Sequence, residues 1–207
     1  MKIKTLTEYG VYNWDNKAYL ITNNNESILI EPVIPYDEVK DYNLKAVLIT
    51  HCHYDHISFL ESYLNKGLLF VMSKKTFQYL KNPEINASRG NLEEEIVMDL
   101  SNEELFLIEK DLEFSLIDLE IKAILTPGHT ADSTSYLIEK NLFSGDFLFK
   151  RSIGRMDLAS GSEIDMKKSL KKITTFEIET IYPGHGRSTT LDYELRNNSF
   201  IKRLLND

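Results

Sequence analysis

Short apolar runs in the first part of the chain predict strands. Residues 11–22 and 27–31 are rich in β-forming side chains, and the asparagines at 23–25 are typical of a turn, so a hairpin is expected to open the fold. Residues 44–50 form another apolar run, which ends at a group of histidines. That group is therefore expected at the carboxyl end of a strand.

The next part of the chain alternates between helix and strand patterns. Apolar residues recur at helical spacing over residues 57–65, and Gly67 is placed to end a helix. Residues 68–72 then predict a strand and residues 73–80 a second helix. Residues 82–95 combine a proline, a glycine, asparagines and a run of glutamates, which predicts a mobile loop.

The second half repeats the order of strands followed by helices. Apolar and polar residues alternate over residues 104–126, which predicts antiparallel strands, and residues 133–138 with 142–144 predict a further hairpin. Residues 163–175 and 191–205 are typical of amphipathic helices. Two strand-rich halves that each carry helices predict two sheets packed face to face with helices outside.

Length and composition predict a single domain over residues 1–207. A hydrophobic fraction of 42% with 27% charged residues is ordinary for a globular protein, and the net charge of -8 argues against nucleic acid as a partner. Cys52 is the only cysteine, so no intrachain disulfide can form. Neither a signal peptide nor a run of about 18 apolar residues is apparent. A cytoplasmic protein with no membrane segment is expected.

All five histidines fall in three short segments, residues 50–56, 126–130 and 182–186. In an extended loop alternate side chains face one side, so His51, His53 and Asp55 can point together while His56 begins the next helix. Imidazole and carboxylate donors suit zinc, manganese or iron, and the absence of thiolates argues against a closed structural zinc site. Crowding these ionisable groups together without a metal would cost desolvation energy.

Three further candidates follow glycines at predicted strand ends. Pro-Gly pairs before His129 and His185 predict tight turns that aim each imidazole into a shared cleft, and Gly145 allows the same for Asp146. Each of these residues alone is more often a turn or surface residue. Together with the segment at 51–56 they predict a metal site.

The ordered motifs T-H-x-H-x-D-H, P-G-H, S-G-D and P-G-H-G resemble the metallo-β-lactamase superfamily over nearly the whole chain. Residues 142–149 and 152–157 narrow the resemblance to the small glyoxalase II-like hydrolases, the hydroxyacylglutathione hydrolase-like proteins. The resemblance implies an α/β fold of four layers, an αβ/βα sandwich with two mixed β-sheets flanked by helices. The site is expected at the edge between the sheets.

The resemblance also implies a ligand set for two divalent metal ions, with zinc expected and iron or manganese as alternatives. One ion would be held by His51, His53 and His129, the other by Asp55, His56 and His185, with Asp146 bridging them. Glu31 stands where many relatives carry an aspartate, and its role stays open. Asn197-Asn198-Ser199 replaces the usual Asn-Pro pair near the end.

The activity implied is hydrolysis of a small-thiol thioester by a hydroxide that bridges the metals, with catalytic Asp55 orienting it. Arg155 is the candidate for binding a substrate carboxylate, although a salt bridge to Asp157 would explain it equally well. Lys150 could add positive charge near the site or be solvated, and Tyr54 is expected to line the pocket. Cys52 is expected to point inward, away from the metals.

Other functions remain open on the same fold. A persulfide dioxygenase would use a single iron, and a lactonase would open a cyclic ester by the same attack. Gly186 directly after His185 favours the hydrolases. An RNA-processing nuclease or a non-catalytic protein fits less well, because the chain is acidic and every expected ligand position is filled. No C-terminal glutathione-binding helical extension is expected, so the thiol carrier stays undefined, and no oligomeric state is predicted.

Overall fold

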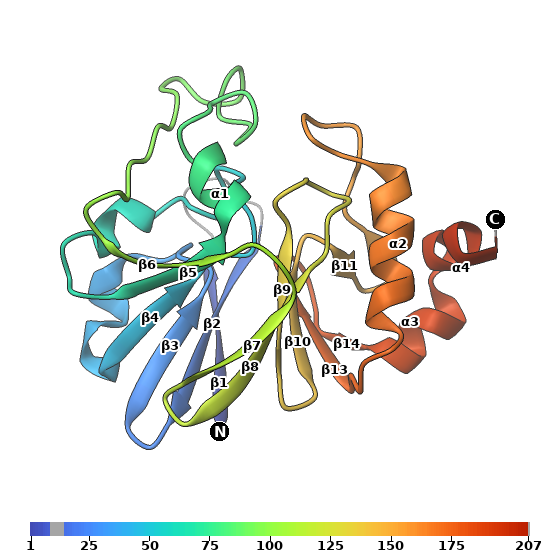
Figure 1. Ribbon diagram of the computed structural model, residues 1–207, viewed down its shortest axis with the longest axis horizontal. Coiled ribbons are helices and arrows are strands. Elements are labelled where there is room, and N and C mark those ends of the chain that lie inside the picture. Colours follow the sequence, from blue (N-terminus) through green and yellow to red (C-terminus); the bar gives the residue numbers. More distant parts are fainter. Residues whose placement is uncertain (9–14, 207) are drawn as a thin grey trace.

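In the computed structural model, which describes residues 1–8 and 15–206, two six-stranded β-sheets face each other and helices lie on their outer sides (Figure 1). The first sheet keeps the order of the sequence. Its strands are β1 (Lys2–Glu8), β2 (Asn16–Asn23), β3 (Glu26–Ile30), β4 (Leu44–Leu48), β5 (Leu69–Ser73) and β6 (Glu104–Ile108). The first three strands pair antiparallel, and β3 to β6 pair parallel.

The second sheet has the spatial order β14-β13-β10-β9-β8-β7. Its strands are β7 (Leu112–Leu116), β8 (Leu119–Leu125), β9 (Thr134–Ile138), β10 (Asn141–Gly145), β13 (Thr180–Pro183) and β14 (Thr189–Thr190). Only β10 and β13 pair parallel in this sheet, so both sheets are mixed, as predicted. A separate small hairpin is formed by β11 (Leu148–Phe149) and β12 (Ser152–Ile153).

The helices divide between the two outer faces. Those of the first sheet are α1 (Lys74–Tyr79) and the 3-10 turns η1 (Tyr36–Glu38), η2 (Lys40–Tyr42) and η3 (Leu60–Tyr63). Those of the second sheet, on the right in Figure 1, are α2 (Glu163–Ile173), α3 (Leu191–Asn197) and α4 (Ser199–Asn206). No helix in the described part of the chain is both long and apolar enough to cross a membrane.

Side-chain alternation along the strands produces buried layers on both faces of each sheet. In β2, Tyr19 and Ile21 point into the apolar cluster between the sheets, where they join Tyr136 of β9. Ala18 and Leu20 point the other way, into the cluster beneath the outer elements of the first sheet. A third cluster lies between the second sheet and α2 to α4. The predicted four-layer αβ/βα sandwich is thus confirmed.

Most predicted strands are present, but their boundaries and partners differ in places. The predicted opening hairpin corresponds to β2 and β3, and the part of it at residues 11–14 lies outside the described residues. The strand β1 was not predicted. Residues 104–126 do form strands, but β6 pairs parallel with β5 and belongs to the first sheet, so the antiparallel prediction holds only for β7 and β8.

The predicted helix over residues 57–65 is wrong, because only the short turn η3 forms there. The backbone N–H of Phe59 donates to the carbonyl of Pro32 at 3.0 Å, which takes it out of any helical pattern. The apolar residues Ile57, Leu60 and Tyr63 are all buried and recur every three residues, the repeat of a 3-10 helix.

The predicted single helix over residues 191–205 is also wrong, since Asn198 divides it into α3 and α4. Asn198 has extended backbone angles, and its side-chain oxygen accepts from the N–H of Phe200 at 3.1 Å, which starts the second helix. Its side-chain nitrogen donates to the carbonyl of Ser152 at 3.0 Å. Residues 82–95 contain no helix or strand, as predicted, but the carbonyl of Asn86 accepts from the N–H of Tyr54.

Candidate metal centre

The loop that follows β4 places four candidate ligands together. His51, His53, Asp55 and His56 are all at most 4% exposed. Cys52, which alternates with the first two histidines, is fully buried in the apolar cluster under the first sheet. The loop therefore separates its polar and apolar side chains as expected for an extended segment at a strand end.

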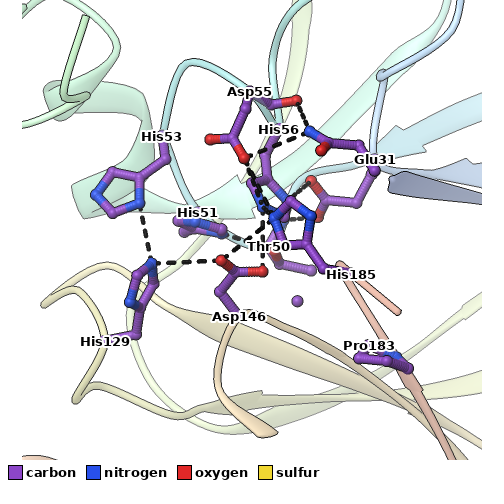
Figure 2. A network of polar contacts seen from close by, with 12 residues as sticks. Glu31, Thr50, His51, His53, Asp55, His56, His129, Asp146, Pro183 and His185 are labelled. Atoms are coloured by element: carbon purple, nitrogen blue, oxygen red, sulfur yellow. Dashed lines mark hydrogen bonds and ion pairs between the residues drawn. The ribbon is translucent and has the colours of Figure 1, made fainter. Parts of the chain in front are cut away.

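The second sheet contributes three single side chains from three different strand ends. His129 follows β8, Asp146 follows β10 directly, and His185 follows β13. All three point toward the loop at residues 51–56 (Figure 2). The carboxyl ends of strands from both sheets thus meet at one place, at the edge predicted from the resemblance.

The ligand atoms of the seven candidates lie within a few ångströms of one another. His53 Nδ1 lies 2.9 Å from His129 Nε2, and His56 Nε2 lies 3.2 Å from His185 Nε2. Three groups could each hold an ion by geometry: His51, His53 and His129; His51, His56 and Asp146; and Asp55, His56 and His185. Two imidazole nitrogens at such a distance repel through their lone pairs unless a proton or a cation lies between them.

Hydrogen bonds on the outer side of the cluster fix which nitrogen faces inward. His129 Nδ1 donates to the carbonyl of Arg155 at 2.7 Å, and His56 Nδ1 donates to Glu31 Oε2 at 2.9 Å. Each bond leaves the Nε2 lone pair directed at the centre, as a metal ligand requires. The second oxygen of Glu31 accepts the N–H of Thr50 at 2.9 Å, so the same carboxylate also holds the start of the loop.

Asn16, at the start of β2, supports the loop from another side. Its side-chain nitrogen donates to the carbonyl of Asp55 at 2.6 Å and lies 3.4 Å from Asp55 Oδ2. Neither Asn16 nor the contact of Glu31 was predicted. The unusual Glu31-Pro32 pair was the one available signal, and nothing in the local pattern marks Asn16.

The histidines of the cluster differ in their electrostatic surroundings. Burial holds the pKa of His51 well below its ordinary value and lowers the pKa of His53 to about 3. Both imidazoles are therefore neutral, and each has a nitrogen lone pair that can bind a metal ion. Burial acts the same way on His56, but neighbouring carboxylates, Asp146 foremost, raise its pKa well above the ordinary value. This negative field favours a cation beside His56.

Two buried atoms identify the space where a metal fits. His51 Nε2 has no hydrogen-bond partner among the described residues, and Asp146 Oδ1 has only its ion-pair contact with His56, although each atom is shielded from solvent. Asp146 Oδ1 lies 3.1 Å from His56 Nε2, and its other oxygen lies 3.7 Å from His129 Nε2. Buried polar atoms that lack a hydrogen-bond partner are rare. Imidazole nitrogen and carboxylate oxygen are atoms that zinc, manganese and iron accept as ligands. The residues therefore fit a metal.

Two glycines allow the strands of the second sheet to reach the centre. Gly145 has a left-handed φ of +49°, and a Cβ there would lie 2.7 Å from Thr50 Cβ. A Cβ on Gly184 would lie 2.5 Å from Asp146 Oδ1 and would also collide with the His56 ring. Side chains at either position would push the two sheets apart at the site.

A cavity of about 650 Å³ opens beside the cluster. Tyr54 and Arg155 line it, together with the apolar Phe149 and Leu158 and, from the loop at residues 82–95, Ala87 and Asn91. The Arg155 side chain is mostly exposed and makes two hydrogen bonds to Asp157, so the predicted salt bridge is present. Lys150 is absent from the lining, and its Nζ lies instead 5.8 Å from the Tyr193 ring centroid.

A four-layer sandwich with histidines and carboxylates gathered at its strand ends defines a metallo-hydrolase fold with a centre able to bind metal. Residues 12–185 match the metallo-beta-lactamase superfamily, and the chain belongs to that superfamily.

Relatives of known sequence are similar over most of their length. The chain is 30% identical to a probable metallo-hydrolase of Methanocaldococcus jannaschii, over 84% of this chain and 89% of the relative. It is 28% identical to a probable polyketide biosynthesis zinc-dependent hydrolase, BaeB, of Bacillus velezensis, over 91% of this chain and 83% of the relative.

Solved structures agree in fold. The crystal structure of BLEG-1 B3 metallo-beta-lactamase superposes with a TM-score of 0.83 and 26% identity, covering 97% of this chain and 99% of that one. ETHE1 from Myxococcus xanthus superposes with a TM-score of 0.72 and 25% identity, covering 100% of this chain and 91% of that one. The chain is an enzyme of the metallo-β-lactamase fold.

Proposed function

We propose that this protein is a metallo-hydrolase with two metal ions that cleaves the thioester of a small thiol carrying a carboxylate. The observation that carries the proposal is the arrangement of two separate ligand trios around one carboxylate. His51, His53 and His129 form one trio and Asp55, His56 and His185 the other. Asp146 lies between them, with one oxygen 3.1 Å from His56 Nε2 and the other 3.7 Å from His129 Nε2.

Zinc is the metal we propose for both positions. The donors are imidazole nitrogens and carboxylate oxygens with no thiolate, a set typical of catalytic zinc sites, although iron and manganese accept the same donors. The relative BaeB is named as a zinc-dependent hydrolase. Bound divalent ions would make a water molecule more acidic and polarise the carbonyl that it attacks.

Asp55 is the residue that we assign to orienting the nucleophile. Its Oδ2 lies 3.2 Å from His185 Nε2, the residue lines the cavity, and Asn16 donates to its backbone carbonyl. A carboxylate held in this way can accept a hydrogen bond from a water molecule and direct its lone pair at a substrate carbonyl. The neutral imidazoles cannot accept that bond while they hold metal.

The cavity suits a small, partly apolar substrate. A volume of about 650 Å³ lies within the range of small-molecule sites. Phe149 and Leu158 offer apolar walls, and Arg155 offers the guanidinium that best matches a carboxylate. Acyl conjugates of small thiols, including S-lactoyl conjugates, combine a reactive carbonyl, an apolar stem and a carboxylate.

The second candidate function is a persulfide dioxygenase that uses a single iron. The similarity to ETHE1 from Myxococcus xanthus favours it. The convergence of Asp55, His56 and His185 favours the hydrolase, because a mononuclear enzyme needs only one ligand trio. A lactonase would use the same two trios on a cyclic ester.

Metal analysis and a substrate panel test the proposal together. The purified chain is expected to bind two zinc ions and to hydrolyse carboxylate-bearing thioesters faster than lactones, as followed by acid release for both and by thiol release for the thioesters. Asp55→Ala is expected to remove turnover. One iron per chain with oxygen uptake on a persulfide would overturn the hydrolase assignment, and full turnover by Asp55→Ala at full metal content would overturn the role of Asp55.

A further inference from the structure

Asp132 is a fully buried carboxylate that the proposed chemistry does not use. It is 1% exposed, and its Oδ2 accepts the backbone N–H of Cys52 at 2.9 Å and the hydroxyl of Thr76 at 3.0 Å. Its Oδ1 has no hydrogen-bond partner among the described residues. A buried charge with neutral partners is costly, so this side chain needs a physical explanation.

The contacts of Asp132 connect three segments that meet behind the metal centre. Asp132 lies three residues after His129, and Cys52 lies between His51 and His53. The backbone carbonyl of Asp132 accepts the hydroxyl of Ser73 at 3.0 Å, the residue that caps α1. One residue therefore ties the turn that carries His129 both to the loop at residues 51–56 and to the start of α1.

The position of the bond to Cys52 matters for the geometry of the first trio. His53 Nδ1 and His129 Nε2 lie only 2.9 Å apart although they come from different sheets. The backbone N–H of Cys52 belongs to the peptide that joins His51 to Cys52, directly between two of the three imidazoles. Because Asp132 accepts that N–H, its position sets how far the loop reaches toward His129.

We propose that Asp132 is a positioning residue that sets the spacing of His51, His53 and His129 and so determines how tightly this trio binds a divalent ion. The assignment rests on the metal ligands proposed above and is independent of the substrate. Supporting residues behind metal ligands typically change metal affinity by 10- to 100-fold when they are lost.

The test is stepwise zinc binding by the full chain after removal of metal, measured by competition with a chromophoric chelator. His53→Ala identifies which of the two affinities belongs to the trio. Asp132→Ala is expected to weaken that affinity about 10- to 100-fold and leave the other nearly unchanged. Asp132→Asn is expected to restore most of it, because an amide oxygen can still accept the N–H of Cys52. With cobalt in place of zinc, the visible absorption of the cobalt ion at this trio should shift in Asp132→Ala and not in Asp132→Asn.

Glu194→Gln is the matched control for loss of a buried charge. Glu194 is fully buried in α3 and accepts from Thr189 and Asn198, away from the ligands. The substitution Glu194→Gln is expected to lower the melting temperature without changing either zinc affinity. If Asp132→Ala fails to fold, Thr76→Val removes one bond to the same oxygen and should weaken the trio in the same direction.

The outcomes separate this inference from the proposed function. Two zinc affinities that are unchanged in Asp132→Ala, or lowered equally, would overturn the positioning role and leave the ligand assignment standing. A parent protein that binds no zinc would overturn both.

Discussion

The two sheets build their shares of the metal centre in different ways. The first sheet supplies four candidate ligands from one loop, residues 51–56, and the second supplies His129, Asp146 and His185 from three separate strand ends. The loop is shaped by polar partners, whereas the strand ends depend on small residues that let the backbone come close. One half of the site is therefore specified mainly by hydrogen bonds and the other mainly by the absence of side-chain volume.

The polar partners of the loop come from outside it. Glu31 holds His56 and the N–H of Thr50, Asn16 holds Asp55, and Asp132 holds the N–H of Cys52. Each contact crosses a large distance in sequence. Removing one of them should therefore change the metal centre while leaving most of the packing in place.

Substituting Gly184 by Ala should give the largest effect, because Gly184 closely approaches two of the candidate ligands, His56 and Asp146. The added Cβ would lie 2.5 Å from Asp146 Oδ1 and would collide with the His56 ring. Displacing ligands by about an ångström typically costs about 100-fold in rate, and overpacking costs about 1–3 kcal/mol of stability. Metal content, turnover and urea unfolding would measure these losses.

Gly186→Ala is the control for this substitution. Gly186 has a φ of +76° with no atom within 4 Å of an added Cβ, so Ala there strains the backbone by about 1–2 kcal/mol without a collision. It should lower stability and keep the metal content of the parent. Equal metal loss in both variants would show that turn conformation, and not volume, shapes this half.

Glu31→Gln should have the next largest effect, since it disturbs the first half through a hydrogen bond. An amide can present an oxygen to the N–H of Thr50 or to His56 Nδ1, but it places an NH2 group on the other partner. Metal affinity should fall about 10- to 100-fold. Glu31→Asp keeps the negative charge on a shorter side chain, so the metal affinity of this variant should fall less. Unchanged zinc affinity in Glu31→Gln would mean that the loop is held by its packing alone.

The same contrast explains what could be predicted from the sequence. The ligand loop is visible because its residue types are chemically unusual at such short spacing, and the strand β4 before it is apolar and buried at every position except Lys45. The role of Glu31 could not be predicted, because its partner His56 lies 25 residues away. Asp132 and Cys52 are separated by 80 residues, and only the fold brings them together.

The fold itself shows similar limits. Alternation predicted β7 and β8 well, and the hairpin predicted at residues 133–138 and 142–144 corresponds to β9 and β10. The strand β1 escaped prediction because it is an edge strand whose residues are mostly exposed or half-buried and carry little apolar pattern. The helices at residues 57–65 and 191–205 were mispredicted because apolar spacing does not reveal where a tertiary hydrogen bond interrupts the backbone pattern.

The smallest effect is expected from Arg155, whose backbone and side chain serve different purposes. Its carbonyl accepts His129 Nδ1 at 2.7 Å, and any residue at this position keeps that bond. Its guanidinium is mostly exposed at the cavity and is shared with Asp157. Arg155→Ala should therefore leave zinc affinity and kcat unchanged and raise the KM for a thioester with a carboxylate roughly three- to tenfold.

A neutral thioester of the same size distinguishes this role from a general loss of order at the cavity. Its KM should be the same in Arg155→Ala and in the parent, because no carboxylate is lost from the contact. Asp157→Asn should act in the opposite direction, since it releases the guanidinium from its present partner and lowers the KM of the charged substrate alone. A rise in KM for both substrates in Arg155→Ala would mean that the side chain shapes the cavity wall, and that its pairing with Asp157 is the interaction that matters there.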